Sequence, residues 1–388
     1  MVTFRISKMT SQFRAVSLDD YEVEARKYLP ADGLAFYTSG SDGEETLRDN
    51  TKAARRYRLR PRVLINVSTV DTSSTILGHP VNFPVCVSPS AWHKFAHTEA
   101  EMASAKGASE AGVAMTLSSV STTSKEHLTS SYPNGLFFMQ AYVLRSEKLQ
   151  QVMLRDLKEN GFKAVVLTVD CQVLSNRRKQ FSSSLTEKVV SKEMRSFRLI
   201  NYLVTDEMRE AEAQGGGFWI QTLFHQAHGA APTSLEYIQF VKAVSNLPVI
   251  VKGILSGKAA RLAVENGADA VWISNHGGRQ LNFTPSTLDV LSEVADAVKG
   301  SSAEVYIDSG FRTGTDVFKA LAMGAKAVFI GRPVLWGLAV AGSNGVRDVL
   351  EILRDELKLC MTLCGCPNIA AISKSHVISE SSYLATKL

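Results

Sequence analysis

One histidine in this sequence stands in the kind of segment that positions a catalytic base. His276 lies between sharp-turn elements in the run from Ser274 to Arg279 (SNHGGR). An imidazole there can take a proton from a hydroxyl group near neutral pH. Asp170 is the acid that we expect to orient this imidazole and to stabilise its charged form. The two residues predict general-base chemistry on a hydroxyl-bearing substrate.

Two arginines follow the candidate base and acid. Arg279 lies three residues after His276, and Arg177 lies seven residues after Asp170. Two guanidinium groups suit one carboxylate, because each can donate paired hydrogen bonds to its oxygens. The substrate is therefore expected to be a carboxylic acid. Lys252 ends an apolar run, where its burial would be costly unless it faced a carboxylate or a negatively charged cofactor.

Two glycine-containing segments carry the features of a phosphate site. Asp308 precedes the run from Ser309 to Gly314 (SGFRTG), and Gly331 precedes Arg332. Barrel proteins commonly bind phosphate at these positions with glycine N–H groups and a helix N-terminus. If the glycines only made tight turns, the arginines at 312 and 332 would be unexplained. The segments therefore predict a phosphorylated cofactor.

Eight short apolar, β-rich runs alternate with segments of helical period from Pro84 onward, which is typical of βα units. Glycine recurs where a helix ends and a strand begins, at Gly112, Gly161, Gly267 and Gly324. Polar residues gather after the runs, and the carboxyl ends of the strands hold the active site in barrels of this type. We therefore predict an α/β fold, a (β/α)8 TIM barrel over residues 84–373. The expected strands are Val85–Ser88, Val113–Leu117, Leu136–Gln140, Ala164–Val169, Pro248–Lys252, Ala270–Ser274, Val305–Asp308 and Val328–Gly331.

The other segments are assigned by their position around the barrel. Residues 1–83 form an N-terminal extension with helices over Leu18–Tyr28 and Gly33–Ser39, expected to cover the bottom or side of the barrel. Residues 179–217, in the long connection after the fourth strand, predict a mobile active-site flap. Thr98–Glu101 (TEAE) predicts a capping box opening the first barrel helix. Residues 374–388 form a C-terminal tail.

The composition indicates a soluble globular protein and argues against several functions. The 388 residues are 45% hydrophobic and 21% charged, and the net charge of +5 includes no run of like charges that would indicate nucleic-acid binding. No apolar stretch approaches the roughly 18 residues that span a bilayer. Five cysteines without a secretory signal favour reduced thiols. Cys360, Cys364 and Cys366 could in principle bind a metal, but without a fourth ligand nearby we expect none.

Both ends of the sequence carry features of targeting signals. The first 18 residues lack acids and contain Arg5, Lys8 and Arg14, a weak transit-peptide feature, and Met9 is an alternative start. The last three residues, 386–388 (TKL), resemble the Ser-Lys-Leu address read by the peroxisomal import receptor. A chance tripeptide is the alternative, and a cytoplasmic location would then be expected.

From about Leu18 to Ile372 the chain resembles the FMN-dependent L-2-hydroxy acid oxidase and dehydrogenase family, which includes glycolate oxidase, lactate oxidase and the flavin domain of flavocytochrome b2. The most specific shared motif is SNHGGRQ at 274–280. The supporting motifs are PVCVSP at 84–89, MTLSS at 115–119, FMQAY at 138–142, TVD at 168–170, VKGI at 251–254 and DSGFRTG at 308–314.

The resemblance implies FMN as the cofactor and assigns residues to each part of it. Backbone groups near Val87 and Ser88 would face the flavin ring. The ring and ribityl chain would be surrounded by Ser118, Gln140, Thr168, Lys252 and Ser274. The ribityl and phosphate end would be held by Asp308, Ser309, Gly310, Arg312, Gly331 and Arg332.

The resemblance also implies roles in the reaction. His276 would be the base with Asp170 as its partner, and Arg177 and Arg279 would bind the substrate carboxylate. Tyr142 would hydrogen-bond the substrate, and Lys252 near the flavin would stabilise its anionic reduced form.

The sequence departs from the glycolate-type pattern beside the substrate. Phe36 replaces a tyrosine that contacts the substrate carboxylate, as it does in the long-chain 2-hydroxy acid oxidase branch, and Val120 replaces a tryptophan. The first change removes a hydrogen bond to the carboxylate, and the second opens space beside the substrate's α-substituent, so both point away from glycolate toward a longer side chain. Smaller departures, which put the local geometry of the phosphate end and flap in doubt, are Ser88, Gln172, Ser175 and Ser309.

The resemblance implies oxidation of an L-2-hydroxy acid, of medium or long chain, to the 2-oxo acid. About eighty residues precede the barrel and match the family's own helices, so oxygen, reduced to hydrogen peroxide, is the expected acceptor rather than a haem domain. Glycolate or lactate as substrate, or another acceptor, is the alternative. The rivals of other classes are a non-redox phosphate-binding barrel and a catalytically inactive flavin-binding protein. By resemblance, we expect a homo-oligomer, often a tetramer in this family.

Overall fold

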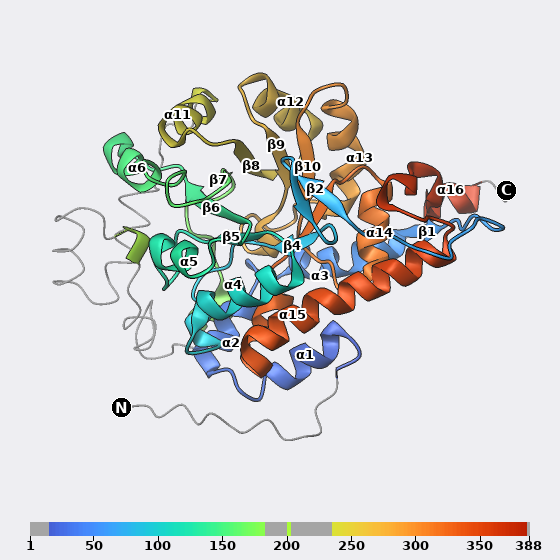
Figure 1. Ribbon diagram of the computed structural model, residues 1–388, viewed down its shortest axis with the longest axis horizontal. Helices are drawn as coiled ribbons and strands as arrows, with labels where there is room; N and C mark the ends of the chain where they lie inside the picture. Colours follow the sequence, from blue (N-terminus) through green and yellow to red (C-terminus); the bar gives the residue numbers. More distant parts are fainter. Residues whose placement is uncertain (1–14, 183–199, 203–234, 386–388) are drawn as a thin grey trace.

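The computed structural model describes residues 15–182, 200–202 and 235–385. Its centre is a closed barrel of eight parallel strands in the order β10-β11-β4-β5-β6-β7-β8-β9 (Figure 1). The predicted (β/α)8 fold is therefore confirmed. Its strands are β4 (Val85–Val87), β5 (Met115–Leu117), β6 (Phe137–Tyr142), β7 (Ala164–Thr168), β8 (Val249–Ile254), β9 (Ala270–Ile273), β10 (Glu304–Ile307) and β11 (Ala327–Ile330).

The strands form where runs of β-branched and aromatic residues can be buried on both faces of a parallel sheet. All five residues of β7 are buried, and inside the barrel the rings of Trp272 and Phe329 lie 3.9 Å apart between centroids. The outer helices are α4 (Ala100–Ala111), α5 (Lys125–Ser131), α6 (Glu147–Leu154), α11 (Glu236–Ser245), α12 (Gly257–Glu265), α13 (Thr287–Ala297), α14 (Gly314–Ala322) and α15 (Arg332–Leu363).

The ends of these helices agree with the glycine pattern but not with the predicted capping box. The glycines at 112, 161, 267 and 324 all have positive φ, as expected for left-handed residues at junctions. Helix α4, however, begins without a side-chain cap, because the Glu101 side chain is buried and accepts hydrogen bonds from two neighbouring loops instead. The capping-box prediction was therefore wrong.

The N-terminal extension reaches the functional end of the barrel. Helix α1 (Leu18–Ala25) packs on α15, while α2 (Ala31–Thr38) and α3 (Glu45–Lys52) follow it (Figure 1). Helix α2 brings Phe36 and Tyr37 into the wall of a pocket lined by residues that follow the carboxyl ends of the strands. The expectation that the extension covers the bottom or side was therefore wrong for α2.

Shorter strands lie outside the barrel. The hairpin of β2 (Ser74–Ile76) and β3 (His79–Val81) meets the amino end of β10, where Leu77 N donates to Glu304 Oε2 at 3.1 Å. The C-terminal residues also pair: β12 (Val377–Ser379) runs antiparallel to β1 (Tyr57–Leu59), and α16 (Glu380–Ala385) follows it. The segment after residue 373 is therefore tied to the N-terminal extension.

Several predictions fall partly or wholly outside the described residues. Of the predicted flap at 179–217, only residues 179–182 and 200–202 are described, and Met9 and the tripeptide 386–388 lie outside the description. Within the described part of the chain, no helix is both long and apolar enough to cross a membrane.

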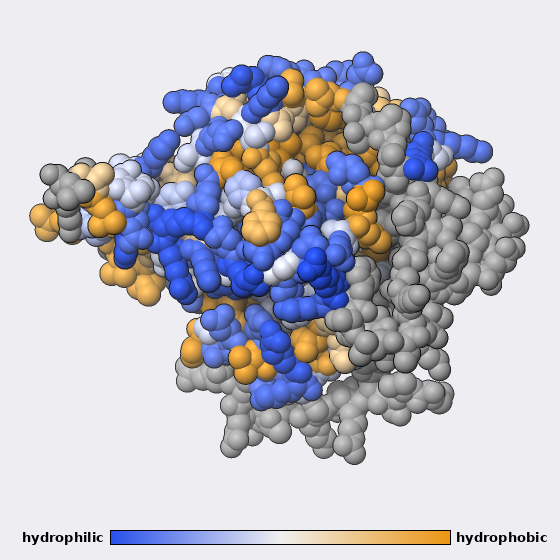
Figure 2. Space-filling model, turned by 180° about the vertical axis from the view of Figure 1, so that it is seen from behind, coloured by the Kyte–Doolittle hydropathy of each residue, from blue (hydrophilic) through white to orange (hydrophobic). Residues whose placement is uncertain are grey.

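The face behind the view of Figure 1 is hydrophilic across its middle, with an apolar area above (Figure 2).

Candidate active site

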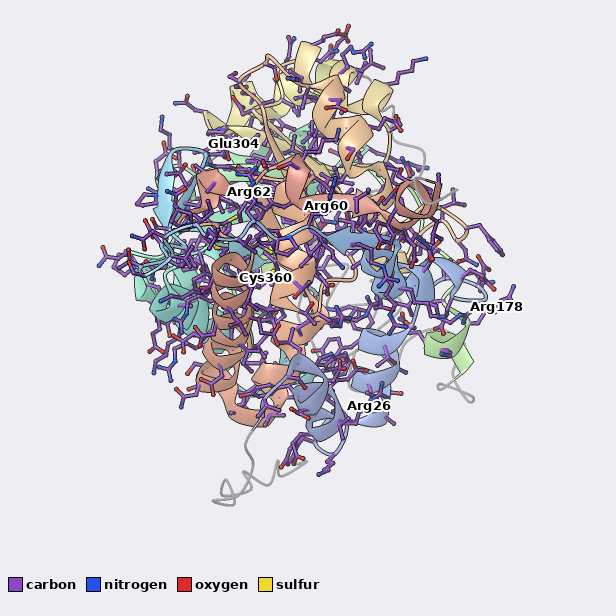
Figure 3. The ribbon with its side chains drawn as sticks, turned by 90° about the vertical axis from the view of Figure 1, so that its right-hand side faces the viewer. Arg26, Arg60, Arg62, Arg178, Glu304 and Cys360 are labelled. Carbon is purple, nitrogen blue, oxygen red and sulfur yellow. The ribbon has the colours of Figure 1, made fainter. Side chains whose placement is uncertain are left out.

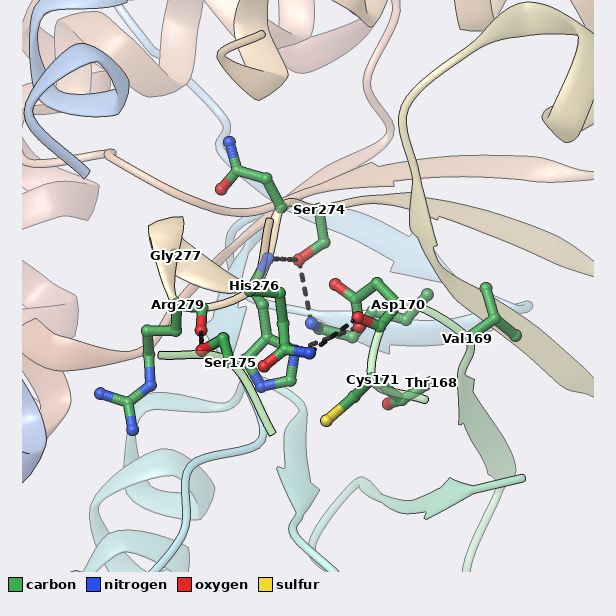
Figure 4. Close-up of polar contacts among 12 residues, drawn as sticks. Thr168, Val169, Asp170, Cys171, Ser175, Ser274, His276, Gly277 and Arg279 are labelled. Carbon is green, nitrogen blue, oxygen red and sulfur yellow. Dashed lines mark hydrogen bonds and ion pairs between the residues drawn. The ribbon is translucent and has the colours of Figure 1, made fainter. Parts of the chain in front are cut away.

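The histidine and aspartate singled out in the sequence meet at the carboxyl end of the barrel. His276 opens the short helix η5 (His276–Gly278) after β9, and Asp170 follows β7. His276 Nδ1 lies 3.1 Å from Asp170 Oδ1 (Figure 4). When the Nδ1–H of a neutral His276 donates to the Asp170 carboxylate, the Nε2 nitrogen is left as the acceptor for a substrate proton.

The charges of this pair are set by burial and by their neighbours. Burial lowers the pKa of His276 below its ordinary value, although the Asp170 carboxylate opposes this shift. Burial alone would raise the pKa of Asp170, but His276 and the Lys252 ammonium outweigh it and hold the pKa below its ordinary value. At neutral pH the site therefore holds a neutral imidazole beside an ionised carboxylate.

The loop that carries His276 is held in a left-handed conformation. His276, Gly277 and Gly278 have φ of 58°, 66° and 74°. A side chain at Gly278 could not be accommodated, because its Cβ would lie 2.6 Å from the backbone nitrogen of Leu47 on α3. A reciprocal amide pair fixes the same contact, with Asn50 Nδ2 2.9 Å from Asn275 Oδ1 and Asn275 Nδ2 2.7 Å from Asn50 Oδ1.

The two predicted carboxylate-binding arginines meet at the end of this loop, where Arg279 directly follows Gly278 and Arg177 contacts the Arg279 backbone. Arg279 donates to the backbone oxygens of Phe36 and Ser39, and its guanidinium lies 4.7 Å from the centre of the Phe36 ring. Arg177 donates to the Arg279 backbone oxygen at 3.2 Å and to Gln280 Oε1 at 3.1 Å. Neither guanidinium forms an ion pair with a carboxylate of the described residues, so the pocket presents two cations that a bound acid could neutralise.

Burial disfavours the charged forms of these arginines. It lowers the pKa of Arg177, and it lowers the pKa of Arg279 further because Arg177 and Arg332 are also nearby. Such repulsion among cations is relieved when an anion binds between them. The arrangement therefore favours a carboxylate ligand.

Hydroxyl, amide and ammonium groups also line the pocket. Lys252, which is 4% exposed, donates from Nζ to Ser274 Oγ at 2.9 Å and lies 3.5 Å from Asp308 Oδ2. The carboxylate partner expected for Lys252 is therefore Asp308. On the other side, Gln140 Nε2 donates to Thr168 Oγ1 at 3.1 Å. These groups offer donors and acceptors to a flat polar ring.

The predicted phosphate segments lie together at another part of the same pocket. Ser309, Gly310 and Arg312 precede α14, and Gly331 and Arg332 begin α15. Burial lowers the pKa of Arg312, and burial together with the Arg312 charge lowers the pKa of Arg332 to about 10. Neither arginine forms an ion pair within the described residues, so a phosphate group fits here by charge.

The pocket brings together most of the residues predicted from the sequence. Its lining includes all of them except Val87, Asp170 and Ser274. Asp170 and Ser274 touch the lining side chains of His276 and Lys252, whereas Val87 is buried within β4. The sequence reasoning did not assign a site role to the following lining residues: Tyr37, Pro89, Ser90, Ala91, Trp92, Cys171, Leu174, Ser175, Gln180, Gly277, Phe311, Phe329, Ile330 and Leu335.

Trp92 is the most informative of the missed residues. It directly precedes His93 in the loop after β4, and its ring lies 4.7 Å from that of Phe36. An aromatic residue just after a barrel strand was the available signal.

The cysteine motif lies apart from this pocket. Cys360, on α15, is far from Arg178 at the start of α7 (Arg178–Ser182) in Figure 3. Cys366 Sγ lies 3.3 Å from His376 Nε2, a neighbour that the sequence did not indicate. Burial raises the pKa of Cys360 to about 12 and that of Cys366 to about 11, which opposes thiolate formation. No three metal-binding side chains cluster suitably within the described residues.

At two parts of this pocket, arginines have no carboxylate partner among the described residues, which suits a phosphorylated cofactor beside a carboxylic acid. This arrangement places the protein among the cofactor-dependent (β/α)8-barrel enzymes. Residues 25–379 match the model of the FMN-dependent dehydrogenase family. The chain belongs to this family. The predictions of an FMN-dependent oxidoreductase and of FMN as its cofactor are thereby confirmed.

Individual relatives extend this similarity over almost the whole chain. A peroxisomal (S)-2-hydroxyacid oxidase of Arabidopsis thaliana, GLO4, is 38% identical over 96% of this chain and 99% of its own. The 2-hydroxyacid oxidase 1 of Homo sapiens is 39% identical over 94% of this chain and 96% of its own. The crystal structure of a lactate oxidase of Pediococcus acidilactici, marked putative, superposes with a TM-score of 0.84 at 31% identity, covering 95% of this chain and 96% of that one.

Proposed function

We propose that this protein oxidises (S)-2-hydroxy acids with side chains of medium or long length to 2-oxo acids, and passes the electrons to oxygen to form hydrogen peroxide. The observation that carries the proposal is the neutral His276, held by Asp170 and flanked by the arginines at 177 and 279. The relatives named above as 2-hydroxyacid oxidases support both the substrate class and the acceptor.

The chain's own residues can carry out the proton transfer. Arg177 and Arg279 bind the substrate carboxylate, and Tyr142 in the pocket wall hydrogen-bonds the substrate. His276 Nε2 then takes the proton of the 2-hydroxyl group, and Asp170 stabilises the imidazolium that forms. When bound, FMN supplies the acceptor for the hydride that leaves the α-carbon.

The same residues that fit FMN by charge and polarity would hold it. The ring would lie against Ser88, Ser118, Gln140, Thr168 and Lys252, with Ser274 positioning Lys252. The Lys252 ammonium would favour negative charge on the bound flavin. The ribityl and phosphate end would be bound by Asp308, Ser309, Gly310, Arg312, Gly331 and Arg332.

The preference for longer side chains is proposed from three apolar walls of the pocket, which are the side chains of Phe36, Trp92 and Val120. Phe36 has no hydroxyl for the substrate, and its ring is already engaged by Trp92 and by the Arg279 guanidinium. Val120, also in the lining, is far smaller than a tryptophan. A larger side chain on the substrate would therefore find apolar surface rather than a hydrogen-bonding partner.

An anaerobic titration of the FMN-loaded protein tests this function. We expect the oxidised-flavin absorbance to be lost on addition of (S)-2-hydroxy acids, at lower concentrations for side chains of six or more carbons than for glycolate, and not with the (R)-enantiomers. Bleaching by glycolate alone would contradict the chain-length proposal. A protein that binds FMN but is bleached by none of these acids would instead be a catalytically inactive flavin-binding protein.

Val120→Trp is expected to narrow the pocket. For a 2-hydroxy acid of eight carbons, kcat/KM should fall by about 10- to 100-fold, because a large ring would occupy the space of the substrate's side chain. Glycolate turnover should change far less. The measurement is steady-state peroxide production with both acids. An equal fall in kcat/KM for both would mean that Val120 does not lie beside the substrate's side chain.

The pH dependence of flavin reduction follows from the lowered pKa of His276. A protonated imidazole cannot accept the substrate proton, so kcat/KM should rise with pH through the His276 pKa and then level off. Because that pKa lies below the ordinary value of 6.5, the acidic limb should have its midpoint below pH 6.5. Stopped-flow reduction rates between pH 4.5 and 8 test this, and a midpoint above 6.5 would contradict it.

A peroxisomal location is also proposed, from the last three residues and from relatives named as peroxisomal. Helix α16, which precedes them in the sequence, is exposed. Binding of the full chain to the peptide-binding domain of the peroxisomal import receptor should be lost when Leu388 is removed. Binding that survives this truncation would rule out the tripeptide as the signal. A homo-oligomeric state, expected from the resemblance, can be measured by light scattering.

A further inference from the structure

A buried carboxylate outside the catalytic pair joins two loops of the pocket. Glu101 on α4 is 0% exposed. Its Oε1 accepts from the backbone nitrogens of His93 and Thr122, both at 3.2 Å. Its Oε2 accepts from Thr122 Oγ1 at 2.8 Å and Thr123 Oγ1 at 2.9 Å. All four partners are donors, so both side-chain oxygens of Glu101 act as hydrogen-bond acceptors.

The two loops joined by Glu101 carry two of the three apolar walls described above. His93 directly follows Trp92 in the loop after β4, and Thr122 follows Val120 by two residues in the loop after β5. The third wall, Phe36, contacts the Trp92 ring at 4.7 Å between centroids. Movement of either loop relative to the other would therefore change the width of the pocket where the substrate's side chain is proposed to lie.

The loop after β4 needs such support because its backbone is strained. Trp92 has φ of 56°, a left-handed conformation that costs a residue with a side chain about 1 kcal/mol or more. Hydrogen bonds other than those of Glu101 also hold this loop, since Tyr37 Oη donates to the Trp92 oxygen at 2.6 Å and His93 Nδ1 lies 2.8 Å from Ser104 Oγ on α4. Glu101 binds both this loop and the loop after β5.

We propose that Glu101 is a positioning residue that fixes Trp92 and Val120 relative to each other and thereby sets which substrate side chains the enzyme accepts. This inference rests on the proposed function, because it assumes that the side chain of a 2-hydroxy acid lies against these two walls. It does not depend on which chain length the wild-type enzyme prefers.

Glu101→Gln tests the proposal with little change in shape. The amide nitrogen must replace one of the two acceptor oxygens, so one set of donors loses its partner. We expect the ratio of kcat/KM for 2-hydroxyoctanoate to that for lactate to change by about tenfold, chiefly through KM. FMN content and the saturating rate of flavin reduction by lactate should stay within about threefold of wild type. Glu101→Ala should change this ratio of kcat/KM values further. If Glu101→Ala does not fold, the result for Glu101→Gln decides the test.

Glu110→Gln is the matched control. It makes the same chemical change on the same helix, but Glu110 is a surface residue paired with Arg347 at 3.3 Å and reaches neither loop. Hydrogen exchange gives a readout independent of activity: peptides covering residues 89–95 and 119–124 should exchange faster in Glu101→Gln and unchanged in Glu110→Gln.

The outcomes separate the inference from the function on which it rests. A changed ratio with faster exchange in both loops supports the role of Glu101. An unchanged ratio, an equal loss for both acids, or unchanged exchange in the loops overturns it. The wild-type preference among chain lengths is read from the same data, so a failure of the chain-length proposal would appear in the wild type rather than in the variants.

Discussion

Replacement of His276 by glutamine is expected to slow anaerobic flavin reduction by about 10³- to 10⁴-fold while FMN stays bound. His276 Nε2 is the only basic nitrogen that the Asp170 contact leaves free on this side chain, and a glutamine amide cannot take up a proton near neutral pH. The measurement is a stopped-flow record of the oxidised-flavin band after mixing with a saturating (S)-2-hydroxy acid.

Two controls make this result specific to proton transfer. The FMN content of the His276→Gln variant should match wild type, because the predicted phosphate residues lie on other loops. Affinity for an unreactive dicarboxylate such as oxalate should fall by less than about tenfold, since Arg177 and Arg279 remain in place. A variant that reduces its flavin at a rate near that of wild type would remove His276 from the role of base.

Asp170→Asn should have the second largest effect, a loss of about 10²- to 10³-fold in the same rate. The neutral amide no longer stabilises the imidazolium, and an amide N–H that donates to Nδ1 would move the imidazole proton onto Nε2. Substrate binding should change little, because Asp170 is absent from the pocket lining.

The pH profile distinguishes this role of Asp170 from a general loss of structure. The Asp170 carboxylate raises the pKa of His276 against the opposing effect of burial. Its removal should therefore move the acidic limb of kcat/KM to lower pH than in wild type. A lowered rate with an unmoved or higher midpoint would mean that Asp170 supports the fold of the site rather than the charge of His276.

The barrel could be predicted from the sequence because its signals are local. Each strand is a short apolar run, and a glycine such as Gly112 marks the point where a helix gives way to the next strand. The capping box predicted at 98–101 was wrong because that prediction used only the local sequence. A local pattern cannot show that Glu101 is drawn inward by donors from residues 93, 122 and 123, which other loops bring beside it.

The sequence by itself determined the barrel, the loop that carries His276, and the arginines that accompany the base and the phosphate segments, because in this fold polar residues that follow strands gather at one end. Only the tertiary structure decided how they meet. His276 and Asp170 are 106 residues apart in the chain, and the Phe36–Trp92 contact joins α2 to the loop after β4. Such contacts depend on how separate elements pack, so no single segment encodes them.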